Sequence, residues 1–138
     1  KPRRRVSPMK TLFAEFTALP GHEDRVAELM AGLTEKVRRE PGNVAFLPFT
    51  REEHPRRWFV FEQYRDEAAF EAHITADYGA EFNAQLVHHI VEDGSELTWL
   101  NEPAATAWRP TRRGVLGCRG VGRVWWGAAA RLADGGVL

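Results

Sequence analysis

The chain has 138 residues, of which 43% are hydrophobic and 28% charged, and this is the composition of one ordinary globular domain. Its 19 basic and 19 acidic residues balance overall, but residues 11–102 hold 8 basic and 18 acidic ones, while both ends of the chain are basic. An acidic central region argues against a nucleic-acid-binding surface there, so we expect no nucleic-acid partner.

Residues 1–10 form a basic extension with five basic groups and no acid, a pattern typical of solvated tails. Met9 precedes a strand-like segment and could be the natural start, which would make residues 1–8 an upstream addition. This segment lacks the apolar core of a signal peptide, and the chain has no apolar run of about 18 residues that could cross a membrane. We therefore expect a cytoplasmic protein with no membrane partner.

The first predicted elements are a strand over residues 10–19 and a helix over residues 22–39, at the start of a domain that spans residues 11–102. In the strand, apolar and more polar residues alternate, which gives it one buried face. A Pro-Gly pair marks the turn after the strand, and a second pair marks the end of the helix. Helical spacing places five apolar residues on one helix face: Val26, Leu29, Met30, Leu33 and Val37.

Two further strands are predicted over residues 43–51 and 58–64. Pro48 cannot donate a hydrogen bond to a neighbouring strand, so the first of them should lie at a sheet edge. Residues 52–57 indicate a polar hairpin connection with His54 as an exposed turn residue. The second strand carries aromatic and β-branched residues on both faces, which indicates a central strand.

A helical region follows, with Asp66 as its predicted N-cap. Gly79 should interrupt or kink this helix, and Asp93-Gly94 should end the helical region before a short last strand over residues 96–100. Spacings of three and four residues form an inward-facing stripe along it: Phe70, His73, Ile74, Phe82, Leu86 and Ile90.

The predicted order is therefore β-α-β-β-α-β, the split βαβ pattern of a ferredoxin-like α+β domain with a four-stranded antiparallel sheet. Both helices then cover one face of the sheet, and a domain of about 92 residues buries limited surface by itself. Because aromatic side chains also occupy the other face, we expect a homodimer in which two sheets form a dimeric α+β barrel. A ligand pocket can then lie between sheet and helices or inside the dimer barrel, since both faces of the central strand are apolar.

Four short segments share their order and spacing with a known family: Glu40-Pro41-Gly42-Asn43, residues 58–64 (WFVFEQY), Asp66 with Ala69-Phe70, and His73 with Phe82. They resemble the antibiotic biosynthesis monooxygenase family, which includes small quinol monooxygenases. The resemblance covers residues 11–102 and implies a dimeric ferredoxin-like fold that oxygenates phenolic or quinol substrates without metal, flavin or haem. Many members have a second histidine five residues after the first, where this chain has Tyr78.

Oxygenation of this kind needs few groups: a base, a donor to the oxyanion, and apolar walls. His73 is the candidate base or proton shuttle, because an imidazole titrates near neutral pH, although it could instead cap or pack a helix. Glu62 could orient His73, or act as the base with a pKa raised by its aromatic surroundings. The structural alternative for Glu62 is an ion pair with Arg65 or Arg51.

Five further residues complete the candidate site. Asn43 could donate its amide to a developing oxyanion, although asparagine after Pro-Gly is also common in turns. Trp58 and Tyr64 share the face of Glu62 and could bind an aromatic substrate by stacking and by the Tyr64 hydroxyl, or they could be plain core residues. Phe70 is a candidate wall or core residue, and Tyr78 is the remaining candidate substrate-binding residue.

The tail over residues 103–138 is rich in Ala, Gly and Arg and has no sustained period, so we expect it to be largely disordered, with one short helix after Trp125-Trp126 as the alternative. Cys118 is the one cysteine, so the chain forms no internal disulfide. His88 and His89 point about 100° apart on a helix and do not share a metal site, so no metal is expected.

The favoured function is therefore a cofactor-independent monooxygenase that oxidises a quinol or polyketide-like phenol with dioxygen. Two alternatives keep the same fold but change the chemistry: haem binding and breakdown, or isomerisation of a small carbonyl compound. A non-catalytic dimeric ligand-binding module is the third class.

Overall fold

The computed structural model describes residues 8–103. Most of the predicted basic extension (residues 1–7) and nearly all of the predicted tail (residues 104–138) lie outside the described residues, so the expectations for them stay predictions.

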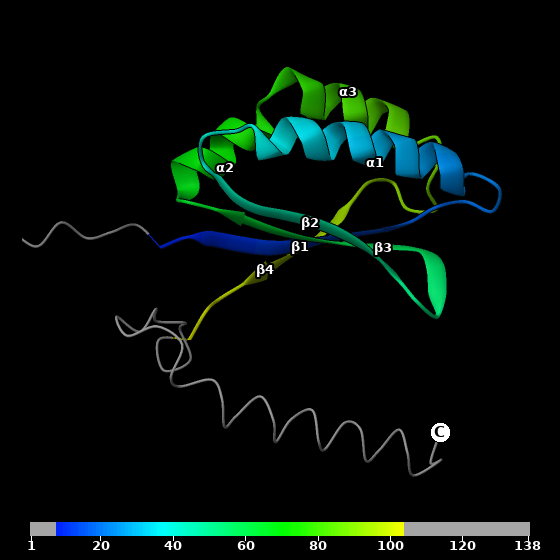
Figure 1. The fold of residues 1–138 in the computed structure, drawn as a ribbon, viewed down its shortest axis with the longest axis horizontal. Coiled ribbons are helices and arrows are strands. Elements are labelled where there is room, and N and C mark those ends of the chain that lie inside the picture. The colour runs from blue at the N-terminus through cyan, green and yellow to red at the C-terminus, as the bar shows by residue number, and fades with distance from the viewer. Residues whose placement is uncertain (1–7, 104–138) are drawn as a thin grey trace, which may run out of the picture. The chain divides into compact units, whose positions relative to one another are not determined.

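The elements are β1 (Lys10–Thr17), α1 (Glu23–Arg38), β2 (Asn43–Arg51), β3 (His54–Tyr64), α2 (Glu67–Ile74), α3 (Asp77–Leu86) and β4 (Glu96–Leu100). The described chain forms a four-stranded antiparallel sheet in the strand order β2-β3-β1-β4, with every helix on one side of it (Figure 1). This confirms the ferredoxin-like α+β fold. It also confirms β2 as an edge strand and β3 as an interior one.

The second helical region differs from the prediction, because it is two helices and the element order is β-α-β-β-α-α-β. The break lies at Thr75 and Ala76 and not at Gly79, which sits inside α3. The Thr75 hydroxyl donates to the Glu71 carbonyl oxygen at 2.8 Å, and Ala76 is extended with ψ 135°, so the chain changes direction there. Ile90 is also not helical, because it lies beyond the end of α3. It is buried and forms an isolated antiparallel β-bridge with Ala18, in the segment after β1.

The hairpin before β3 is shorter than predicted. β3 begins at His54, which pairs with Arg51, so only Glu52 and Glu53 form the turn. His54 is exposed as expected, but it belongs to the strand. The polar run from His54 to Arg57 lacks the apolar alternation that marks a half-buried strand. Its strand conformation comes from backbone pairing, because His54 pairs with Arg51 of β2 and Arg57 pairs with Thr17 of β1.

The core lies between the sheet and the helices, where alternate residues of β1 and β3 meet the apolar stripe of α1. The opposite face of the sheet is also apolar. The ring centroid of Phe13 lies 4.0 Å from that of Phe59 and 5.7 Å from that of Phe61. Phe49 at the edge of this face is 55% exposed. We call this surface the open face. The predicted homodimer would cover it and remains a prediction.

Candidate functional site

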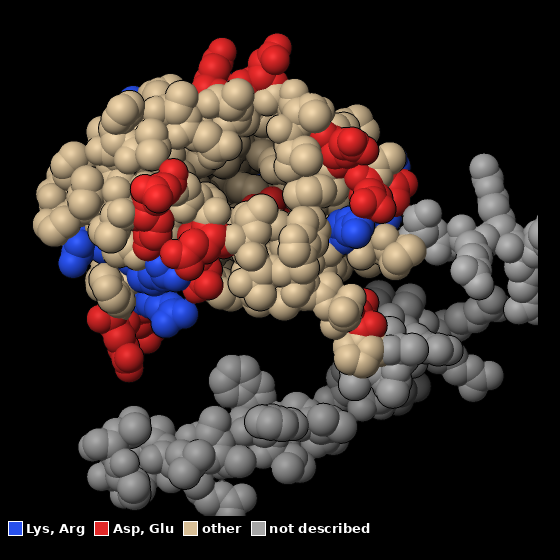
Figure 2. Space-filling view, turned by 180° about the vertical axis from the view of Figure 1, so that it is seen from behind, with Lys and Arg blue, Asp and Glu red and all other residues tan. Residues whose placement is uncertain are grey.

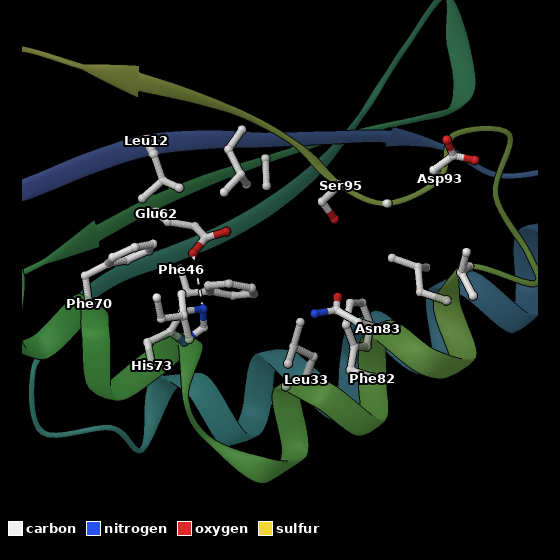
Figure 3. A pocket seen from close by; sticks show the side chains of 17 residues that line it. Leu12, Leu33, Phe46, Glu62, Phe70, His73, Phe82, Asn83, Asp93 and Ser95 are labelled. Carbon is white, nitrogen blue, oxygen red and sulfur yellow. Dashed lines mark ion pairs between the residues drawn. The ribbon is translucent and has the colours of Figure 1, made fainter.

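A pocket of about 410 Å³ lies between the sheet and the helices. Figure 2 shows a deep hollow in the surface, with an acidic side chain visible inside it. Sheet and helix residues alike contribute to its lining, which places the pocket on the helix side of the sheet (Figure 3). Its walls are mostly apolar and include Leu12, Leu33, Phe46, Phe82, Leu86 and Leu97.

Glu62 is the acidic group at the sheet side of this pocket. It stands on β3, paired with Leu12 of β1 and Phe46 of β2, and is only 6% exposed. Burial raises its pKa, the direction expected from the sequence, although a hydrogen bond from the Tyr64 hydroxyl at 2.7 Å opposes the rise. Burial of Tyr64 and the charge of Glu62 both raise the pKa of Tyr64, so its hydroxyl group remains a hydrogen-bond donor.

The predicted ion pair of Glu62 with an arginine is not present. Arg51 contacts Glu15 at 3.4 Å, and Arg65 contacts Asp66 at 3.5 Å. The group beside Glu62 is instead His73, whose Nε2 lies 3.7 Å from Glu62 Oε2 and which forms an ion pair with it only when the ring is protonated. Among residues 8–103, Glu62 is therefore a buried carboxyl group held beside an imidazole, with no guanidinium paired to it.

His73 reaches the pocket from α2. Asp66 caps this helix by accepting a hydrogen bond from the Ala69 amide at 2.8 Å, and a spacing of three residues then brings Phe70 and His73 to the pocket wall. His73 Nδ1 lies 3.0 Å and 3.1 Å from the two carboxylate oxygens of Glu40. A carboxylate only accepts, so Nδ1 carries a hydrogen, and Nε2 is the ring nitrogen that faces Glu62.

Glu40 was not a predicted site residue, yet it orients His73. It lies between α1 and β2 and also accepts a hydrogen bond from the Tyr78 hydroxyl of α3. Burial and the Glu40 carboxylate both raise the pKa of Tyr78, so the phenol remains a donor. Glu40 and His73 are 33 residues apart, so local spacing could not predict their contact. The one sequence signal for Glu40 was its place at the start of the Glu40-Pro41-Gly42-Asn43 segment.

Gly42 allows α2 to approach Glu40. A Cβ atom added at Gly42 would lie 2.3 Å from the Cβ of Ala69 on α2, far inside van der Waals contact. The Gly42 carbonyl also accepts a hydrogen bond from the Arg65 amide at 2.9 Å, just before α2 begins. The glycine therefore lets the segment that carries Glu40 and the helix that carries His73 pack closely.

Four predicted site residues do not line this pocket. The Asn43 side-chain amide donates to the Ala45 carbonyl oxygen at 3.1 Å, in its own strand. Trp58 stacks on Phe16 with ring centroids 6.0 Å apart, and Tyr64 and Tyr78 contact Glu62 and Glu40. The predicted residues that do line it are Glu62, Phe70 and His73.

Three polar lining residues were not anticipated: Asn83, Asp93 and Ser95. They follow no motif, and only the tertiary structure brings α3 and the segment before β4 to the same cavity.

The described residues hold no group of three or more His, Cys, Asp and Glu side chains placed to bind a metal ion. His89 instead faces His22, with the two Nδ1 atoms 2.8 Å apart. Within residues 8–103, no helix is long and apolar enough to cross a membrane.

The family profile described as antibiotic biosynthesis monooxygenase matches residues 9–85. No curated protein matches the sequence of the chain.

Among solved structures, PA3566 from Pseudomonas aeruginosa is similar over 73% of this chain and 100% of its own, with a TM-score of 0.67 and 24% identity. Rv0793 from Mycobacterium tuberculosis is similar over 70% and 96%, with a TM-score of 0.65 and 18% identity. A structure described as an antibiotic biosynthesis monooxygenase is similar over 68% and 98%, with a TM-score of 0.64 and 22% identity. Identities this low extend the likeness to the fold alone.

Proposed function

Because this chain belongs to the antibiotic biosynthesis monooxygenase family, we propose that it is a monooxygenase that oxidises a quinol or polyketide-like phenol with dioxygen. We propose further that it needs no metal, flavin or haem, because an electron-rich hydroxyarene supplies the electrons itself. The observation that carries the proposal is the pairing of His73 Nε2 with the Glu62 carboxyl group, 3.7 Å apart, in the wall of an apolar pocket.

The first step is removal of the phenolic proton. His73 Nε2 takes it, and the imidazolium that forms is stabilised by Glu40, which holds Nδ1–H at 3.0 Å. A carboxylate also orients the catalytic histidine in serine hydrolases, and here the half-buried Glu40 holds His73 in the same way. The apolar walls keep water away from the anion, which raises its tendency to give up an electron.

The second step forms the new C–O bond. The phenolate gives one electron to dioxygen, and the two radicals combine at a ring carbon that bears hydrogen, giving a peroxide that takes a proton from His73. Glu62 in its carboxylate form then accepts the C–H proton while the O–O bond breaks. One oxygen atom stays as a carbonyl, and the other leaves as hydroxide, which with the released proton makes water.

The test is oxygen uptake with a panel of naphthohydroquinones and anthrones, measured on the wild type, on His73→Ala and on His54→Ala. Removing a general base costs about 10²–10⁴-fold in rate, so His73→Ala should lose nearly all uptake. His54 is an exposed histidine on β3 that does not line the pocket, so its variant should keep the wild-type rate. Uptake no faster than autoxidation with every substrate would refute the proposal in favour of an isomerase or a binding module.

A further inference from the structure

We infer that the pocket selects an uncharged hydroxyarene of two or three fused rings whose remote ring carries a second hydrogen-bonding substituent, bound by Asn83 and Ser95. This inference rests on the proposed function, because the phenol to be oxidised must stand at the Glu62 and His73 end. The inference adds which substituent the ligand carries at the opposite end of the pocket.

The size of the pocket sets the ring count. A cavity of about 150 Å³ is enough to bind benzene. The pocket here measures about 410 Å³, which leaves room for two or three fused rings beside the reacting hydroxyl group. Its walls of Leu33, Phe46, Phe82 and Leu97 are flat or branched apolar groups of the kind that pack against ring faces.

The charges around the pocket select against an anion. Among residues 8–103, no lysine or arginine lines it, whereas Asp93 does, on the side away from His73. A carboxylate or phosphate at this end of the pocket would lose water without gaining a lysine or arginine partner and would face the Asp93 carboxylate. The ligand is therefore uncharged.

The polar groups of the pocket fall into two sets at different ends. Figure 3 shows Glu62 and His73 together at one end, and Asn83 and Ser95 well apart from them, in the direction of Asp93. Neither the Asn83 amide nor the Ser95 hydroxyl hydrogen-bonds another described residue. Ser95 is half-buried, so a ligand that fills the pocket must offer its hydroxyl group a partner or leave it desolvated, and the exposed Asn83 lies toward the same end.

The segment that carries Ser95 is fixed to the sheet. Glu92, three residues earlier, accepts hydrogen bonds from the Thr17 amide at 2.7 Å, the Thr17 hydroxyl at 2.8 Å and Arg57 at 2.8 Å. Burial acts to raise the pKa of Glu92, but the Thr17 hydrogen bonds and the Arg57 charge outweigh it, so the net pKa is lowered and the carboxylate form holds the anchor. The segment just before Ser95 is therefore anchored to the sheet.

The experiment is calorimetric binding without oxygen, with 1-naphthol and its 5-, 6- and 7-hydroxy derivatives as ligands. One hydrogen bond is worth about 0.5–1.5 kcal/mol, so at least one derivative should bind about two- to tenfold more tightly than 1-naphthol. Asn83→Leu and Ser95→Ala should remove that gain and leave 1-naphthol binding unchanged. Gln85→Leu, an amide on the same helix that does not line this pocket, is the matched control and should change neither.

The charge rule is tested with 5-hydroxy-1-naphthoic acid and its carboxamide. The acid should bind at least about tenfold more weakly, and Asp93→Asn should reduce that difference. Equal affinity for the two compounds would overturn the charge rule, and no preference for any hydroxy derivative would overturn the hydrogen-bonding rule. Because binding is measured without oxygen, discrimination without oxygen uptake would refute only the monooxygenase proposal, and uptake without discrimination would refute only this inference.

Discussion

At the scale of single residues, the site rests on a chain of contacts between side chains from four parts of the sequence, of which Glu62 and Tyr64 are buried. Tyr64 donates to Glu62, Glu62 faces His73, His73 donates to Glu40, and Tyr78 donates to Glu40 from the other side. Only Glu62 and His73 of these five line the pocket, so we assign them the contacts with substrate. Glu40 is a positioning residue that acts through the imidazole.

Glu40→Gln separates the charge of Glu40 from its shape. The Gln oxygen can still accept Nδ1–H of His73, but the imidazolium that forms during proton removal loses its carboxylate partner. A hydrogen bond to a charged group is worth about 1.5–3 kcal/mol, so kcat should fall about 10–100-fold with KM nearly unchanged. Steady-state oxygen uptake measures kcat and KM, and anaerobic binding measures the substrate affinity separately.

The control for Glu40→Gln is Glu35→Gln, which removes an exposed carboxylate paired with Arg39 at the end of α1. It should leave kcat unchanged. A fall in binding affinity that matches the fall in kcat would mean that Glu40 shapes the pocket and does not support proton transfer.

The buried carboxyl group predicts a pH dependence of stability. Because burial raises the pKa of Glu62 above its ordinary value of 4.5, the folded protein keeps this proton at pH values where the unfolded chain has lost it. The contribution of Glu62 to the free energy of unfolding is therefore full below pH 4.5 and falls as pH rises through the folded-state pKa. Glu62→Gln should become steadily more stable relative to the wild type over that rise.

Urea unfolding at a series of pH values from acidic to neutral measures this difference for wild type and Glu62→Gln. Glu71→Gln, at an exposed position on α2, supplies the baseline for losing one carboxylate. A constant difference between wild type and Glu62→Gln at every pH would show that burial does not favour the protonated carboxyl group.

At the scale of elements, the critical contact is the one between α2 and the segment before β2. α2 has eight residues and no fully buried one, so its position depends on its Asp66 cap and on close packing at Gly42. The Glu40–His73 hydrogen bond spans this same contact. The geometry of the Glu40–His73 hydrogen bond therefore depends on how closely α2 packs against the segment before β2.

Gly42→Ala should disturb that fit. The new methyl group would meet Ala69 Cβ at 2.3 Å, and neither atom belongs to a flexible side chain, so α2 must move. Overpacking of this kind costs about 1–3 kcal/mol, and the His73–Glu40 geometry should suffer with it. Thermal and urea unfolding measure the loss, and oxygen uptake reports the geometry.

Gly32→Ala is the matched control, because a Cβ atom there meets nothing within 4 Å and the residue lies inside α1. Alanine in a helix interior is favoured over glycine by about 0.5–1 kcal/mol, so this variant should be more stable than the wild type. If both variants gained stability, the proposed close approach of α2 would be wrong.

At the scale of the whole molecule, the open face is an apolar surface that no described helix covers. Phe13, Phe59 and Phe61 cover its centre, and Leu47 and Phe49 extend it over β2. Apolar patches of this kind on small domains are commonly covered by association. We predict that a second copy of the chain covers it, with the substrate pockets on the far side of each sheet.

Phe49→Lys tests the dimer with little effect on the monomer, because this side chain is 55% exposed. Burying a lysine among aromatic rings is unfavourable, so the dimer should dissociate at least about tenfold more readily. Ala31→Lys, exposed on α1 in the helix layer, should leave the association unchanged. Sedimentation equilibrium measures both, and a monomeric wild type would refute the prediction.

The sequence by itself determined most of the fold. The alternation in β1, the aromatic β3, the proline in β2 and the helical stripe of α1 predicted the antiparallel sheet, its edge strand and its interior strand. These features were predictable because local periodicity follows directly from which face of an element is buried. The sequence placed the break in the helical region at Gly79, whereas it lies at Thr75 and Ala76. A hydrogen bond from the Thr75 hydroxyl to the Glu71 carbonyl oxygen and an extended Ala76 do not change the spacing of the apolar residues, so the sequence pattern did not reveal them.

The sequence also made His73 and Glu62 candidates, and both line the pocket. They could be selected because an imidazole on a helix and a carboxyl group among aromatic residues on a strand are visible as local patterns. It did not identify Glu40, Asn83 or Ser95, and it put Asn43 and Trp58 at a site that they do not line. It also left open which face of the sheet holds the pocket. Only the tertiary structure decided these points, because they depend on side chains brought together from distant parts of the chain, and local spacing carries no information about such contacts.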